Sequence, residues 1–107
     1  MIGDRMFEKL GYTKFDNHPD DEKLEPNKWT TQDCRVIEYS QTKTINGMTY
    51  TMFIRFHFVG EVIEIGANKR KKGVRTMAIP VNPVLNMQEV RAIEVKGKEL
   101  GWKIFKG

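Results

Sequence analysis

Hydrophobic and polar residues alternate on both sides of Asn46-Gly47, and this alternation is the clearest pattern in the chain. Asn-Gly favours a two-residue hairpin turn, because both central residues of that turn adopt positive φ. A hairpin closed there gathers the large apolar side chains on one face, and a slip of one residue would scramble both faces. The predicted pairs are Ile45 with Met48, Lys43 with Tyr50, Tyr39 with Ile54, Ile37 with Phe56, Arg35 with Phe58, Thr44 with Thr49, Thr42 with Thr51 and Glu38 with Arg55.

Alternating residues and turn residues predict further strands around this hairpin. Gly60 allows a turn after its second strand. Pro80 has no amide hydrogen to donate, so the strand that contains it should lie at a sheet edge or end there. The strands are expected at residues 11–15, 33–43, 48–59, 61–66 and 74–81, with polar surface loops at 16–28 and 67–73.

Two helices are predicted, one near each end of the chain. Asp4 can cap the first, at residues 4–10, and Gly11 ends it. The second is amphipathic and has about four turns; Asn86 is its N-cap, and Glu89 follows three residues later, as in a capping box. Its apolar stripe consists of Met87, Val90, Ile93, Gly97 and Leu100, while Gln88, Glu89, Arg91, Glu94, Lys98 and Glu99 lie off the stripe. Gly101 ends this helix, and an apolar tail with Trp102, Ile104 and Phe105 should pack back on the body.

These elements predict an α+β fold in one domain, residues 1–107. An antiparallel four- to five-stranded meander sheet is packed by the C-terminal α-helix, with a short N-terminal helix. The second sheet face also carries apolar residues, and such a surface needs a cover. We expect the N-terminal helix, in preference to a partner, to cover Val36, Phe53, Val59 and Val62.

Composition adds a cellular setting and an uneven charge. The chain has a net charge of +4, but residues 1–33 hold five Lys or Arg against eight Asp or Glu, so the excess of positive charge follows them. No apolar run approaches the ~18 residues of a membrane span. The N-terminus is charged and the chain has one cysteine, Cys34. We therefore expect a cytoplasmic protein without a disulfide framework, a signal peptide or a membrane partner.

The most conspicuous charge feature is the run Lys69-Arg70-Lys71-Lys72, with Arg75 just beyond it. In the predicted loop these cations would project into solvent and could hold phosphates or an acidic protein surface. The alternative is a solvated loop that keeps an edge hairpin from aggregating. No aromatic residues interleave with the run, so base stacking is not predicted.

Arg55 and His57 form a second candidate binding site, on the polar face of the hairpin. Arg55 is expected to pair with Glu38, and His57 lies opposite Val36. Cys34 and His57 share this face, but neither a third metal ligand nor a group to orient the histidine accompanies them. The acidic run Asp20-Asp21-Glu22 lacks the spacing of a calcium loop. We therefore predict no metal, no cofactor, no catalytic residue and no enzymatic activity.

The two ends of the chain resemble those of small, mostly uncharacterised phage and prophage proteins of Gram-positive bacteria. The similar segments are Met6-Phe7-Glu8-Lys9-Leu10-Gly11-Tyr12 and the helix end Glu99-Leu100-Gly101-Trp102, about 20 residues with Ala92-Ile93 included. The resemblance implies an accessory protein of the host cytoplasm; some such proteins block host defences. It transfers no catalytic residue.

Three functional hypotheses follow. The first is a non-enzymatic binding protein that occupies a host protein or nucleoprotein, such as a CRISPR effector, through Lys69 to Lys72 with Arg75 and through the Arg55 and His57 face. The second is direct nucleic-acid binding by the basic residues 69–75. The third is an oligomeric sponge for anionic nucleotides. The oligomeric state and the identity of the partner stay open at this stage.

Overall fold

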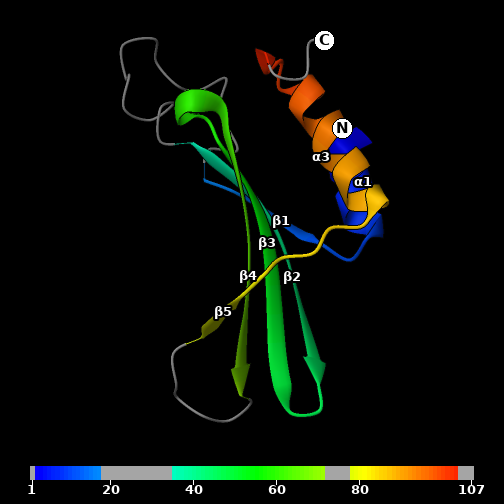
Figure 1. Cartoon of the computed structure of the whole chain (residues 1–107). Coiled ribbons are helices and arrows are strands. Elements are labelled where there is room, and N and C mark those ends of the chain that lie inside the picture. The colour runs from blue at the N-terminus through cyan, green and yellow to red at the C-terminus, as the bar shows by residue number, and fades with distance from the viewer. Residues whose placement is uncertain (1, 18–34, 72–77, 104–107) are drawn as a thin grey trace.

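The structure is a computed structural model, and it describes residues 2–17, 35–71 and 78–103. Figure 1 shows a long twisted sheet with two helices beside one end of it. Along the chain the elements are α1 (Ile2–Lys9), β1 (Thr13–Asp16), β2 (Val36–Ile45), β3 (Met48–His57), the short 3₁₀ helix η2 (Val59–Glu61), β4 (Val62–Lys71), β5 (Ile79–Val81) and α3 (Met87–Glu99).

The sheet is an antiparallel meander with the strand order β1-β2-β3-β4-β5, so the predicted α+β fold is confirmed. The hairpin register is also confirmed, from Ile45 opposite Met48 to Ile37 opposite Phe56. Asn46 and Gly47 both have positive φ, as the turn requires. Pro80 lies in β5, an edge strand, where no neighbour needs the amide hydrogen that proline lacks.

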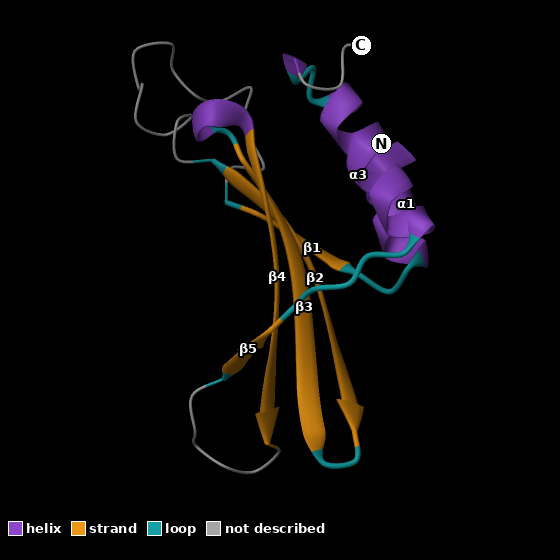
Figure 2. Ribbon diagram, viewed as in Figure 1, coloured by secondary structure: helices purple, strands orange, loops and turns teal. Residues whose placement is uncertain are grey.

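Both helices pack on the same face of the sheet, as Figure 2 shows. Phe7 of α1 stacks on Tyr39 of β2 with ring centroids 3.9 Å apart, and it also contacts Phe56 edge-on. The expectation that the N-terminal helix covers the second face is therefore wrong. Phe7 is fully buried on the first face, against Tyr39, Tyr12 and Phe56, so this apolar side chain of α1 is not available to the second face.

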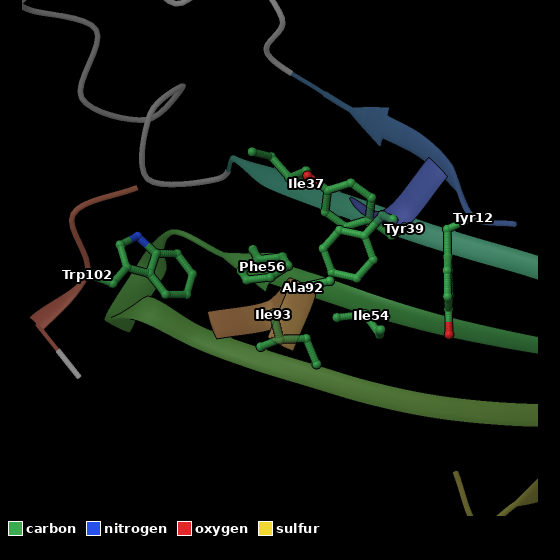
Figure 3. Close-up of a cluster of buried hydrophobic side chains, with 9 residues drawn as sticks. Tyr12, Ile37, Tyr39, Ile54, Phe56, Ala92, Ile93 and Trp102 are labelled. Carbon is green, nitrogen blue, oxygen red and sulfur yellow. The ribbon is translucent and has the colours of Figure 1, made fainter. Parts of the chain in front are cut away.

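The core lies between the two helices and the upper half of the sheet in the view of Figure 1. Figure 3 shows it as a row of side chains, with Trp102 at one end and Tyr12 at the other. Trp102 packs against Phe56 and Phe58, so the predicted return of the tail is confirmed for this residue. Ile104 and Phe105 lie outside the described residues. The buried apolar residues are Phe7, Tyr12, Ile37, Tyr39, Ile54, Phe56, Ala92, Ile93 and Trp102.

Helix α3 is rotated relative to the predicted apolar stripe. Met87 and Val90 are exposed, whereas two charged residues, Glu89 and Lys96, are buried. The predicted capping box is confirmed, because the Asn86 side chain accepts from the Glu89 amide and the Glu89 carboxylate accepts from the Asn86 amide. The rotation is stabilised by partners from distant parts of the chain. Tyr12 donates a hydrogen bond to Glu89, and Lys96 forms an ion pair at 3.0 Å with Asp4.

Asp4 lies inside α1, which begins at Ile2, so the prediction that Asp4 caps this helix is wrong. Its carboxylate instead accepts hydrogen bonds from Tyr39, Lys14 and Lys96. Burial alone would raise the pKa of Asp4, but these hydrogen bonds outweigh burial and lower it far below its usual range. α1 and α3 also approach closely here, because a Cβ at Gly3 would lie 3.2 Å from Lys96 Cα.

Candidate functional site

The basic run does not begin in a loop. β4 extends to Lys71, so the predicted strand end at residue 66 and the predicted loop at 67–73 are both wrong for residues 67–71. The polar side chains of this segment suggest a loop, but backbone pairing with β3 makes it part of β4. The pairs are Lys69 with Tyr50, Arg70 with Thr49 and Lys71 with Met48. Lys72 and Arg75, like residues 74–77 of the predicted fourth strand, lie outside the described residues.

Because residues alternate between faces along a strand, the run is divided between the two faces of the sheet. Lys69 and Lys71 share the face of Tyr50 and Met48, and Arg70 shares the face of Thr49. The first of these faces is the one that the helices cover further up. The helices do not extend to the lower end of the sheet, which projects beyond them in Figure 1. We call this end, residues 41–52, 67–71 and 79–81, the distal arm.

Tyr50 occupies the middle of the distal arm on the helix-facing side, with a cation on each side of it. Lys43 of β2 and Lys69 of β4 are its direct cross-strand neighbours. Side chains in such positions lie about 5 Å apart at Cβ, within contact of one another. Tyr50 is 39% exposed. The next row toward the hairpin turn consists of Ile45, Met48 and Lys71, of which Ile45 is 55% exposed.

A hollow of about 190 Å³ opens beside Tyr50 on the distal arm. Its lining combines polar and basic residues with apolar ones. It is smaller than the roughly 300–1,000 Å³ of a pocket for a whole small molecule, so it suits one flat group of a larger ligand. The residues around it are Gln41, Lys43, Tyr50, Thr51, Met52, Ala67, Asn68 and Val81.

All charged residues of the distal arm are cations. No Asp or Glu occurs in residues 39–60 or 65–88, and the arm carries Lys43, Lys69, Arg70 and Lys71. Within the described part of the chain, none of these four side chains forms an ion pair. The described acidic residues lie on the helices and toward the other end of the sheet. Positive charge is therefore concentrated at one end of the molecule and left available to an anion.

Arg55 and His57 lie on the second face, near the end of the sheet opposite the distal arm. Arg55 bridges Glu38 at 2.7 Å and Glu64 at 3.3 Å, so the predicted cross-strand pair with Glu38 is confirmed. Its guanidinium also stacks over Phe53, 3.9 Å from the ring centroid. Burial lowers the pKa of Arg55, but hydrogen bonds to both carboxylates outweigh burial and raise it. This arginine is already paired, which makes it a weak site for an anion.

His57 lies opposite Val36, as predicted, and its Nε2 is 2.8 Å from Glu64 Oε1. The hydrogen bond from His57, followed by that from Arg55, lowers the pKa of Glu64. Cys34, His18 and the acidic run Asp20-Asp21-Glu22 lie outside the described residues, so the Cys34 and His57 pair stays untested. Among the residues that the structure places, no three His, Cys, Asp or Glu side chains gather as a metal site.

A larger hollow of about 470 Å³ lies between α1 and α3. Its lining is mainly apolar, and one of its two cations, Arg91, is paired with Glu94 at 3.2 Å. This hollow therefore lacks the concentration of unpaired charge found on the distal arm. Its lining residues are Met6, Lys9, Leu10, Met87, Gln88 and Arg91.

Sequence reasoning missed Tyr50 and Lys43 as site residues. The prediction rested only on the neighbours of the basic run along the chain. No aromatic residue interleaves with the cations there, so base stacking was not predicted. In the sheet, the aromatic interleaves across strands: Lys43, Tyr50 and Lys69 lie in one row. The sequence did indicate one of the two lysines beside Tyr50, since the Asn46-Gly47 register already pairs Lys43 with Tyr50. The second lysine, Lys69, could not be predicted, because it joins the row only through the extension of β4 to Lys71.

None of the described helices has the length and apolar character needed to cross a membrane. Comparisons of the chain with protein-family models, with curated proteins and with solved structures gave no match.

Proposed function

We propose that this protein binds nucleic acid through its distal arm and catalyses no reaction on it. The observation that carries the proposal is the segregation of charge. Four cations, Lys43, Lys69, Arg70 and Lys71, project from a part of the sheet that has no acidic residue and forms no ion pair among the described residues. Affinity for nucleic acid arises mainly from such contacts, because each neutralised phosphate releases bound counterions.

The setting that we propose is the cytoplasm of a bacterial host, as an accessory protein of phage or prophage type. This part of the proposal is supported by the resemblance of the chain ends alone. A binding protein of that kind would act by occupying a nucleic acid or the nucleic-acid component of a host complex, including a defence complex. The extended shape of the distal arm supports this mode of action, because it presents its cations away from the helical body.

The test is equilibrium binding of short labelled DNA and RNA oligonucleotides at about 50 mM salt, where phosphate contacts are strong. The triple variant Lys69→Ala, Arg70→Ala, Lys71→Ala should lose most of the affinity. A matched variant, Lys9→Ala, Lys98→Ala, Lys103→Ala, removes the same charge from exposed positions outside the arm. It should retain most of the affinity. Equal loss in both variants would show that net charge, and not the distal arm, determines binding.

We propose a protein partner on the second sheet face as a second candidate function. Phe15 and Val62 on this face are 62% and 52% exposed, and the Arg55 guanidinium stacked over Phe53 belongs to the same face. Exposed aromatic and arginine side chains are typical of binding hot spots. Affinity capture from host lysate with wild type and with Phe15→Ser, Val62→Ser tests this. One protein captured by wild type and lost from the variant supports the candidate, and identical capture by both contradicts it.

A further inference from the structure

We infer that the distal arm selects single-stranded nucleic acid, with one base stacked on the Tyr50 ring and the adjoining phosphates on Lys43 and Lys69. This inference rests on the proposed function and names its ligand class. It starts from the row of three residues across β2, β3 and β4, in which an exposed tyrosine lies between two lysines.

The first step concerns the surroundings of Tyr50. A surface for phosphates alone would need only cations, but the neighbours of Tyr50 along β3 on the same face are Met48 and Met52. Ile45 and Ile79 add exposed apolar surface at the edges of the arm, at 55% and 56% exposure. This part of the arm therefore has an apolar centre within a basic frame.

The second step is to match that centre to a ligand. In a duplex the flat faces of the bases are stacked on one another, so a duplex would meet the cations and leave the apolar centre in water. In a single strand the bases can separate and stack on aromatic side chains while the backbone follows the cations. A single strand therefore contacts both the cations and the apolar centre of the arm. An acidic protein surface would likewise use only the cations.

The third step is the hollow beside Tyr50. Its volume of about 190 Å³ and its lining by Met52, Ala67 and Val81 offer a flat group apolar contacts next to Tyr50. Lys69 and Lys71 lie on the same face two residues apart, a spacing of about 7 Å along the strand. A backbone that crosses the row of Lys43, Tyr50 and Lys69 meets a cation on each side of the ring, and Lys71 offers the next phosphate a third cation while a base turns toward Tyr50.

The experiment compares a single strand with the duplex of the same sequence, using wild type, Tyr50→Ala and Tyr50→Phe. We expect the single strand to bind more tightly. Tyr50→Ala should weaken it by about 5- to 150-fold, as expected for the loss of one stacked base. Tyr50→Phe keeps the ring and should retain the affinity. Ile2→Ala removes an exposed apolar side chain from α1, outside the distal arm, and should change nothing.

The salt dependence separates stacking from charge. Tyr50→Ala should leave the slope of log affinity against log salt unchanged, because no cation is lost. Lys43→Ala with Lys69→Ala should reduce that slope by about 1.4, from roughly 0.7 per phosphate contact on a single strand. Duplex binding as tight as single-strand binding, with Tyr50→Ala silent, would overturn the inference and leave the proposed function standing. Equally tight binding of polyglutamate would overturn it too, and no binding to any nucleic acid would overturn both.

Discussion

The ammonium group of Lys96 lies 3.0 Å from a carboxylate oxygen of Asp4, although the Lys96 side chain is 99% buried. These residues are 92 positions apart in sequence and join α1 to α3. A buried charge is costly unless it is paired, so this contact fixes which face of α3 turns inward. It also joins the two helices that pack on the sheet beyond the distal arm.

Removing the carboxylate should therefore destabilise the fold strongly. We expect Asp4→Asn to lower the free energy of unfolding by about 3 kcal/mol, because the buried Lys96 ammonium loses the charge of Asp4. Lys96→Met is the matched control. It removes the buried charge itself and leaves Asp4 with Tyr39 and Lys14, so it should cost less. Urea unfolding of the three proteins at neutral pH measures the difference, and a larger loss in Lys96→Met would contradict this account.

Asp4 should also control stability in acid. Its pKa in the folded protein lies below the ~3.9 of an unfolded chain, so the unfolded state binds more protons there and stability rises with pH. The contribution of Asp4 is fully present above about pH 4 and is lost as pH falls through the lower folded pKa. The gap in unfolding free energy between wild type and Asp4→Asn should therefore shrink toward about pH 2. A gap that stays constant across that range would contradict the assignment.

Gly66 and Phe53 should be energetically coupled. A Cβ at Gly66 would overlap the far end of the ring of Phe53, its partner on the neighbouring strand. We expect Gly66→Ala to cost about 1–3 kcal/mol in wild type, because the ring must leave its place under Arg55. In a Phe53→Ala background the same change should cost much less. A double-mutant cycle by thermal unfolding measures the coupling, and additive effects would argue against the contact.

The cap of α3 offers a local test. Asn86→Ala removes the side-chain acceptor for the Glu89 amide, and should lower stability by about 1 kcal/mol. Asn86→Asp preserves an acceptor at this position and should lower it far less. Because Glu89 also accepts from Tyr12, the alanine variant should loosen this end of the core. Loss of protection from hydrogen exchange at Glu89 and Val90, without such loss in β3, would report that local change.

Local signals were enough to predict much of this fold. The Asn46-Gly47 turn determined ten residue pairs between β2 and β3, because one turn geometry sets the whole register. The capping box gave the start of α3 for the same reason, since it involves residues three positions apart. The α+β fold followed from the apolar face that these elements leave open.

Long-range contacts explain what the sequence did not reveal. Glu89 and Lys96 look like exposed residues until Tyr12 and Asp4 supply partners from the other end of the chain. Residues 67–71 look like a loop, and only pairing with β3 makes them a strand. The candidate site depends on that pairing, because Lys69 reaches Tyr50 across strands and not along the chain.

The measurement that tests the central claim most directly is the salt dependence of nucleic-acid affinity in wild type and in Lys43→Ala, Lys69→Ala. Thermal unfolding first checks that both proteins are folded. We expect similar stability, because both lysines lie on the sheet surface. The account predicts affinity that falls steeply between about 50 and 200 mM salt in wild type, and a weaker, shallower dependence in the variant. No binding at low salt, or the same slope in both proteins, would contradict it.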